Sequence, residues 1–135
     1  MDAFPEGWSP CPQSQGFSSL SGPYWERRED GGWVRAFRVE ARHLNPEGVV
    51  HGGVLTAFAD YACYRAIGDE LSHEVRFATI TLTCNFLAAG KEGGVIQARA
   101  AITRRTRSVI FAQGEIADEE RPLMTMSGVW KLLGS

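Results

Sequence analysis

The segment from Asn45 to Asp60 brings together residue types suited to acyl-group chemistry. Gly52 and Gly53 stand where a helix is expected to begin, and Asp60 follows in the middle of that helix. The first turn of a helix offers backbone N–H groups without intrahelical partners and a positive dipole end, so it can stabilise a developing oxyanion. Glycine there lets a ligand approach the backbone closely. Taken alone, the two glycines favour a simple tight turn before a helix.

Asp60 favours a functional site over a simple turn. Its neighbours along the helix are apolar, and no cation lies three or four residues away on either side. A helix ion pair therefore cannot hold it, and burying an unpaired carboxylate is costly. Proteins keep such groups mainly where they use them. The alternative is a carboxylate that reaches solvent or a structural partner on another strand.

The spacing between Gly53 and Asp60 predicts a site shared by two chains. Seven residues separate the two positions, so they lie on one helix face about 10 Å apart along the axis. That distance is too large for one carbonyl group to contact both. If both act on the same substrate, one must come from a second subunit. A two-fold dimer with antiparallel central helices would provide this arrangement twice.

Apolar patterning predicts the elements that position these residues. A helix is expected at 54–67, apolar nearly all round and therefore buried, with Gly68 as its C-terminal stop. An Asp30-Gly31-Gly32 turn is expected to join the first two strands. The expected strands span 24–29, 33–41, 79–86, 95–103, 109–117 and 123–132. One apolar helix with about six antiparallel strands implies an α+β fold, in which the sheet wraps around the helix.

The 135 residues suit one domain, expected at 23–135, preceded by an irregular arm at 1–22. The arm holds three of the six prolines and no sustained period, but its aromatic side chains predict that it packs on the domain. The three cysteines form no CxxC pair, which argues against a disulfide framework and favours a reducing, cytoplasmic location. The three histidines are scattered without metal-ligand spacing, so no metal site is expected.

Charge and hydropathy indicate a small-molecule partner. The formal net charge of −2 gives no reason to expect nucleic acid or an anionic membrane surface. No apolar run approaches the roughly 20 residues that span a bilayer. The first residues also lack the basic and apolar regions of a signal peptide.

The pattern N-x-x-G-x-x-H-G-G-x-x-x-x-x-x-D runs from Asn45 to Asp60. It resembles the signature of the PaaI-like hotdog thioesterases, the phenylacetate-degradation type, and the organisation matches from about residue 24 to residue 132. The resemblance implies a hotdog fold, assembly as a homodimer or homotetramer (a dimer of dimers), and hydrolysis of acyl-CoA thioesters with aryl or medium-chain acyl groups. No cofactor is implied, because coenzyme A is part of the substrate.

The resemblance also implies roles for individual residues. Asp60 would act as a general base on water or as a nucleophile. Asn45 and the Gly52 N–H would polarise the thioester carbonyl from the facing subunit. Thr79 would help to place the water or the carboxylate, although threonine is also an ordinary strand residue.

The remaining candidates would bind substrate. Gly53 belongs to the motif at the helix start, and His51 is expected to hold that loop rather than to transfer protons. Arg105, Arg107 and Ser108 lie in a basic turn that corresponds to the region where the family meets the nucleotide of coenzyme A. Arginine suits its phosphates, while a solvated turn is the alternative.

Two other functions remain open from the sequence. A hotdog hydratase or dehydratase usually supplies a histidine beside an acidic residue, but here His51 stands at the helix start and no HFPG-like run is present. A non-catalytic acyl-CoA sensor would normally add a DNA-binding domain, for which residues 1–22 are too short. Release of free thiol from a panel of acyl-CoA esters separates hydrolysis from binding alone.

Overall fold

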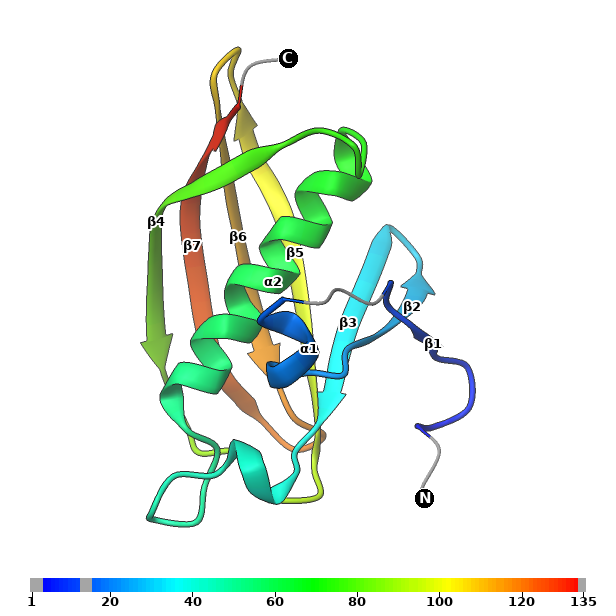
Figure 1. Cartoon of the computed structure of the whole chain (residues 1–135), viewed down its shortest axis with the longest axis vertical. Coiled ribbons are helices and arrows are strands. Elements are labelled where there is room, and N and C mark those ends of the chain that lie inside the picture. The colour runs from blue at the N-terminus through cyan, green and yellow to red at the C-terminus, as the bar shows by residue number, and fades with distance from the viewer. Residues whose placement is uncertain (1–3, 13–15, 134–135) are drawn as a thin grey trace.

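The computed structural model describes residues 4–12 and 16–133, in which a seven-stranded antiparallel sheet curves around one long helix (Figure 1). The sheet order is β1-β2-β3-β5-β6-β7-β4. The elements are β1 Ser9–Pro10, α1 Ser18–Ser21, β2 Trp25–Glu29, β3 Gly32–Arg38, a 3-10 turn Ala41–His43, α2 Gly52–Glu70, β4 Phe77–Phe86, β5 Val95–Arg105, β6 Val109–Ala117 and β7 Pro122–Leu132. The expected α+β architecture is confirmed, with one additional two-residue strand, β1.

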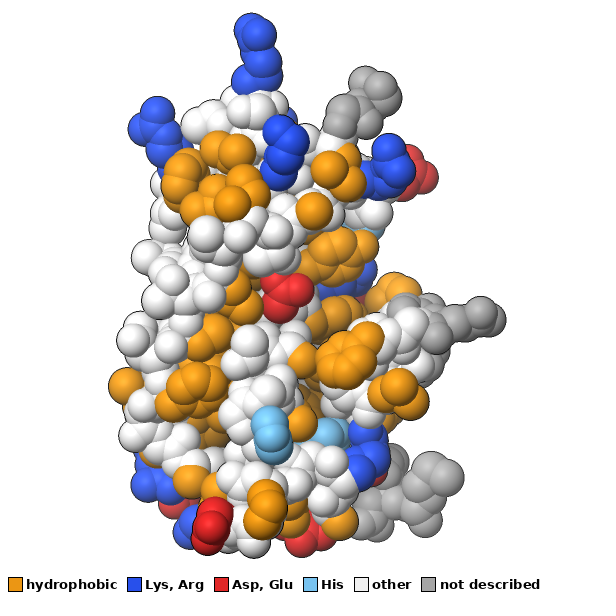
Figure 2. All heavy atoms as spheres, turned by 60° about the vertical axis from the view of Figure 1, so that its left-hand side comes forward, with side chains coloured by type: hydrophobic (Ala, Val, Ile, Leu, Met, Phe, Trp, Pro, Cys, Tyr) orange, Lys and Arg blue, Asp and Glu red, His pale blue; other side chains and the backbone are white. Residues whose placement is uncertain are grey.

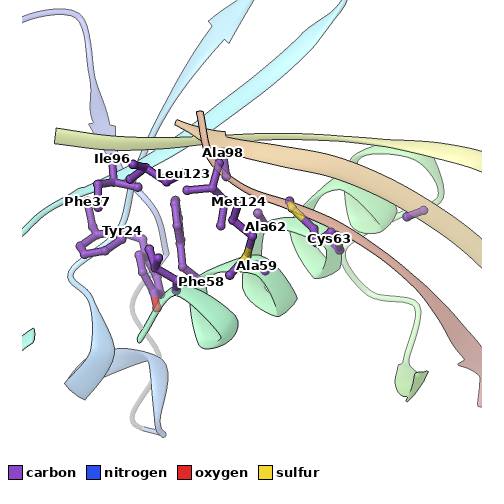
Figure 3. Packing of buried hydrophobic residues seen from close by; sticks show 14 of the residues in the cluster. Tyr24, Phe37, Phe58, Ala59, Ala62, Cys63, Ile96, Ala98, Leu123 and Met124 are labelled. Atoms are coloured by element: carbon purple, nitrogen blue, oxygen red, sulfur yellow. The ribbon is translucent and has the colours of Figure 1, made fainter. Parts of the chain in front are cut away.

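The central helix α2 buries one apolar face against the sheet, whereas its other positions are half-buried or exposed. Its side chains pack on the inner face of the sheet, where Phe58 contacts the rings of Tyr24 and Phe37 (Figure 3). The fully or nearly fully buried helix positions are Leu55, Phe58, Ala59, Ala62, Cys63, Ile67 and Gly68. Phe58 therefore belongs to the hydrophobic core. No helix in the described ranges is long and apolar enough to cross a membrane.

The helix continues past its expected end. Gly68 is not the C-terminal stop, because α2 runs on to Glu70. Glycine at this position instead makes room for the His73 ring, which lies close to the helix backbone. A Cβ atom at this position would lie only 2.2 Å from Nδ1 of His73. The His73 ring is held against the helix by a hydrogen bond from its Nε2 to the Asp69 carboxylate (2.9 Å).

Strand β3 of the β2–β3 hairpin begins and ends earlier than expected. Gly32 is the first residue of β3 and not part of the turn, and β3 ends at Arg38, because the chain then enters the 3-10 turn. Both faces of β3 are buried, and Arg35 is only 3% exposed. Its guanidinium forms ion pairs with Asp69 (2.5 Å) and Glu26 (2.9 Å), which compensate the buried charge.

The N-terminal arm packs on the domain through its first residues. Phe4 stacks on Trp25 of β2 at a centroid distance of 4.8 Å, and the backbone N–H of Cys11 donates to Tyr24 O (3.0 Å). Phe17 differs, since 68% of its surface is exposed. It stands at the start of α1, which lies against the front of α2 (Figure 1).

The outer strand β4 contains a β-bulge that changes which side chains face α2. Thr79 pairs with Trp130 of β7, but Thr81 pairs with Val129, so one extra residue is inserted at Ile80. Before the bulge, Phe77 and Thr79 face α2. After the bulge, Leu82 and every second residue that follows it face α2. Simple alternation, by contrast, places Thr79 on the face opposite Leu82.

Candidate active site

The start of α2 presents one unused backbone donor. His51 caps the helix, because its Nδ1 accepts a hydrogen bond from the Gly53 N–H (2.8 Å). The N–H groups of Val54 and Leu55 donate to His51 O. In the described part of the chain no group accepts the Gly52 N–H. The geometry therefore gives His51 a loop-holding position and leaves the Gly52 N–H available to a ligand.

Glycine is needed at positions 52 and 53 for different reasons. A Cβ atom on Gly53 would lie 2.9 Å from Nδ1 of His51, so the cap itself requires glycine there. A Cβ atom on Gly52 would meet only the Phe86 ring, at an ordinary 3.4 Å. The fold of the single chain would thus tolerate a side chain at Gly52. Glycine at this position keeps the space in front of its N–H open to a ligand.

Asn45 lies in the loop that leads to this helix. Its Oδ1 accepts hydrogen bonds from the N–H groups of Glu47 (2.9 Å) and Val49 (3.3 Å), which fixes the side chain in an Asx turn. None of the described residues accepts its side-chain NH2 group. The amide is therefore oriented by the loop while its donor end remains free.

Asp60 is half-buried on α2 and contacts the strand opposite. The hydroxyl of Thr79 donates to its Oδ1 at 2.7 Å, a contact that the β4 bulge makes possible. Asp60 also borders a cavity of about 200 Å³. The cavity is lined by Phe17, Ser18, Ser21, Tyr24, Ala57, Asp60, Tyr61 and Tyr64. Tyr61 and Tyr64 line it from α2, whereas Ser21 and Tyr24 line it from the arm and the start of β2 and carry no sequence signal for this position.

A second cavity, of about 350 Å³, lies at the start of α2. His51, Gly53 and Val54 line it from the helix, and Arg42 and His43 line it from the 3-10 turn. Phe17 and Ser21 border this cavity as well as the one beside Asp60. The short helix α1 therefore forms a wall common to both cavities.

The thiols near the site are poor nucleophiles. Burial raises the pKa of Cys63 to about 12 and that of Cys11 to about 11. Burial also raises the pKa of Cys84, which borders the same side of α2. Because the thiolate is the reactive form, these groups stay protonated at neutral pH. Among the described residues, no group of three or more His, Cys, Asp or Glu is placed to hold a metal ion.

The structure does not bring the basic turn close to Gly52 and Asn45 within one chain. Arg105, Arg107 and Ser108 lie where β5 meets β6, beside the first residues of β4, whereas Gly52 lies beside its last residue, Phe86. The ten residues of β4 separate these ends by roughly 30 Å. Both arginines are exposed, so the single chain leaves them free for a phosphate or for solvent.

A hollow larger than these two cavities lies elsewhere. A groove of about 670 Å³ runs along the outer side of the sheet, between the β2–β3 hairpin and strands β5 to β7. It contains none of the candidate site residues. Its position follows from the sheet itself, because β3 and β5 pair only from Arg35↔Ala98 to Arg38↔Val95 and then separate.

An antiparallel sheet wrapped around one long central helix is the hotdog fold. A family model described as the thioesterase superfamily matches residues 47–125. The chain belongs to this superfamily, and it is a PaaI-like hotdog thioesterase. The expected enzyme class is therefore confirmed, while the roles of the individual site residues remain predictions.

Three similar proteins illustrate the relationship. A protein of Pseudomonas aeruginosa named as a candidate esterase is 26% identical over 129 residues, which cover 95% of this chain and 96% of that protein. A variant of the phenylacetic acid degradation protein PaaI from Thermus thermophilus is 25% identical, with a TM-score of 0.68 over 75% of this chain and 84% of that chain. A hypothetical thioesterase of Streptococcus pneumoniae, solved with coenzyme A, shares the fold at 23% identity, with a TM-score of 0.72 over 83% and 90% of the two chains.

Proposed function

We propose that the protein hydrolyses acyl-CoA thioesters to the free acid and coenzyme A. The observation that carries the proposal is the pairing of a hydroxyl-held carboxylate, Asp60, with an adjoining cavity of about 200 Å³. The free Gly52 N–H supplies the second requirement of acyl transfer, a donor for the oxyanion. The Streptococcus pneumoniae relative binds coenzyme A, which agrees with this substrate class.

The proposed reaction uses only side-chain and backbone groups of the protein. Asp60 takes a proton from water, and the resulting hydroxide attacks the thioester carbonyl carbon. The carbonyl oxygen becomes an oxyanion that accepts hydrogen bonds from the Gly52 N–H and the Asn45 amide. When the tetrahedral intermediate collapses, the C–S bond breaks and the thiolate of coenzyme A leaves and takes up a proton. As a nucleophile, an Asp60 carboxylate oxygen would instead attack the carbonyl carbon directly and the C–S bond would break, releasing the thiolate of coenzyme A, which takes up a proton. Water would then hydrolyse the mixed anhydride to the free acid and regenerate the Asp60 carboxylate.

We propose that two chains share each site through strand β4. Asp60 and Gly53 remain about two helical turns apart within one chain. The free edge of β4 carries exposed apolar side chains, which gather along this side of the molecule in Figure 2. Ile80 is 52% exposed and Phe86 is 55% exposed. A long apolar edge strand favours pairing with a second copy.

Two-fold pairing along β4 would also explain the distant basic turn. Antiparallel pairing of β4 with its own copy would bring the Phe77 end of one chain to the Phe86 end of the other. Arg105 and Arg107 of one chain would then lie near Gly52 and Asn45 of the second. Such a site would combine Asp60, Thr79 and the basic turn of one chain with the oxyanion donors of the other.

The decisive experiment is thiol release from aryl- and medium-chain acyl-CoA esters by wild type and by Asp60→Asn. We expect the variant to lose about 10²–10⁴-fold in kcat, the usual contribution of a general base, with an unchanged melting temperature. Glu70→Gln on the same helix serves as the matched control and should retain full activity. Near wild-type turnover by Asp60→Asn would refute the mechanism.

Subunit mixing tests the shared site. Asp60→Asn and Asn45→Ala are each expected to have low activity as pure proteins. If each site takes Asp60 from one chain and Asn45 from the other, a mixed dimer has one doubly altered site and one intact site. Activity should therefore partly return after subunit exchange. Failure to recover activity in demonstrated mixed dimers would contradict the shared site without affecting the thioesterase assignment.

A further inference from the structure

We propose that the N-terminal helix α1 limits the size of the acyl group, with Phe17 as the specificity-determining residue. The proposal rests on the proposed thioesterase function and concerns the cavity beside Asp60. It selects compact acyl groups, with no more bulk than about one aromatic ring, over long or fused-ring acyl groups.

The wall of the cavity comes from two separate parts of the chain. Helix α2 contributes Asp60 with the side chains of Ala57, Tyr61 and Tyr64. The arm and the start of β2 contribute Phe17, Ser18, Ser21 and Tyr24. An acyl group whose carbonyl is placed at Asp60 would extend into this space, where four of the eight lining residues are aromatic. A cavity of about 150 Å³ holds one benzene ring, so about 200 Å³ matches a single ring with a short linker.

Helix α1 is held in a fixed position from outside the cavity. The Arg42 guanidinium donates to the carbonyl oxygens of Leu20 and Gly22. His43 Nε2 bonds Ser21 O at 2.8 Å, and the Ser21 hydroxyl bonds the Tyr24 hydroxyl at 2.7 Å. A wall anchored at three successive residues cannot easily move aside for a larger acyl group, so it can discriminate by size.

The side chain with the freedom to set that limit is Phe17. It is 68% exposed, so it contributes little to the core, yet its ring borders the cavity beside Asp60. Leu20, on the same helix, is similarly exposed at 70% but borders only the neighbouring cavity at the start of α2. Truncating Phe17 and truncating Leu20 to alanine therefore form a matched pair, because only the change at Phe17 alters the cavity beside Asp60.

The test measures kcat/KM of the full-length protein for phenylacetyl-CoA, hexanoyl-CoA, decanoyl-CoA and 2-naphthoyl-CoA. Phe17→Ala should raise the ratio of decanoyl or naphthoyl to phenylacetyl activity about 10-fold or more, the discrimination that steric limits in apolar pockets typically provide. Phe17→Trp should lower the same ratio, and Leu20→Ala should leave it unchanged. Melting temperatures would establish that all three variants are folded.

Three results would overturn the size limit. The ratio could stay constant in both Phe17 variants, Leu20→Ala could shift it as much as Phe17→Ala, or wild type could already prefer the long and fused-ring esters. In each of these cases wild type still releases thiol, so the proposed function stands. Absence of thiol release by wild type from every ester would instead refute the proposed function, and the size limit with it.

Discussion

Asn45 and Asp60 each have one side-chain atom fixed by the protein and one left free. Asn45 uses its Oδ1 to hold its own loop and keeps its NH2 group for a ligand. Asp60 has Oδ1 bound by Thr79, while no described residue donates to Oδ2. The His51 cap occupies the Gly53 N–H and leaves that of Gly52. Such pre-orientation reduces the rearrangement that the reaction requires.

Thr79 orients the carboxylate, and its hydroxyl is therefore expected to matter more than its shape. Thr79→Val removes the 2.7 Å hydrogen bond to Asp60 at nearly constant volume. We expect kcat to fall by about 10-fold or more, since the loss of a hydrogen bond to a charged group costs about 1.5–3 kcal/mol. Thr79→Ser should restore most of the activity. Thr83→Val, on the same strand, is the control, and an equal loss in that variant would argue against a specific role.

Gly52 and Gly53 are expected to respond differently to alanine. Gly52→Ala adds a methyl group that meets only Phe86, so the melting temperature should change little while kcat falls, because the methyl group narrows the approach to the N–H. Gly53→Ala forces the His51 ring away and should cost about 1 kcal/mol of unfolding free energy through loss of the cap. Thiol-release assays and thermal unfolding of both variants check this. A fully active Gly52→Ala would contradict the proposed approach of the carbonyl.

At the scale of elements, the part of the site that is continuous in sequence could be predicted. The contacts between residues far apart in the sequence could not. The motif from Asn45 to Asp60 is continuous in sequence, so its loop and helix could be located from residue types alone. The contact between Thr79 and Asp60 depends on one inserted residue in β4, which apolar alternation does not reveal. The position of Phe17 depends on long-range anchoring by Arg42 and His43, for which residues 1–22 carry no pattern.

The anchoring of α1 should make stability depend on pH. Burial lowers the pKa of His43, and its two nitrogens are committed, with Nδ1 accepting the Glu40 N–H (2.9 Å) and Nε2 facing Ser21 O. The unfolded chain therefore binds a proton at higher pH than the folded chain does. Stability is fully present above the ordinary histidine pKa of about 6.5 and is lost as the pH falls below it.

Chemical denaturation at pH 7.5 and pH 5 measures this loss. His43→Gln should show a smaller decrease in unfolding free energy between the two values than wild type, because the titrating group is gone. His73→Gln serves as the control and should keep the decrease that His43 causes. An identical decrease in wild type and His43→Gln would contradict the assignment.

At the scale of the whole molecule, the two edge strands of the sheet differ in length and exposure. The β1 edge is only two residues long, whereas β4 presents ten residues with a free edge and exposed apolar side chains. A short edge strand resists association and a long apolar one promotes it. The asymmetry agrees with assembly through β4, which the proposed shared site requires.

Ile80→Lys tests this assembly. Ile80 is half-exposed near the middle of β4, so two copies related by a two-fold axis would place the introduced charges close together. We expect sedimentation velocity to show a shift towards monomer and thiol release to fall in parallel, because each site loses the partner's donors. Glu119→Lys, in an exposed turn, should affect neither measurement. A fully active monomer would contradict the shared site.

The bulge in β4 also determines where this strand can change in length. A substitution at Ile80 leaves the backbone phase intact, so Thr79 continues to face Asp60. Deleting that one residue would restore regular pairing with β7 and would keep Thr79 on the helix-facing side, because Thr79 and Leu82 would then lie two positions apart. Among descendants of this sequence, selection should therefore tolerate loss of the residue at Ile80 more readily than a single-residue insertion or deletion elsewhere in β4, which would turn Thr79 away from Asp60.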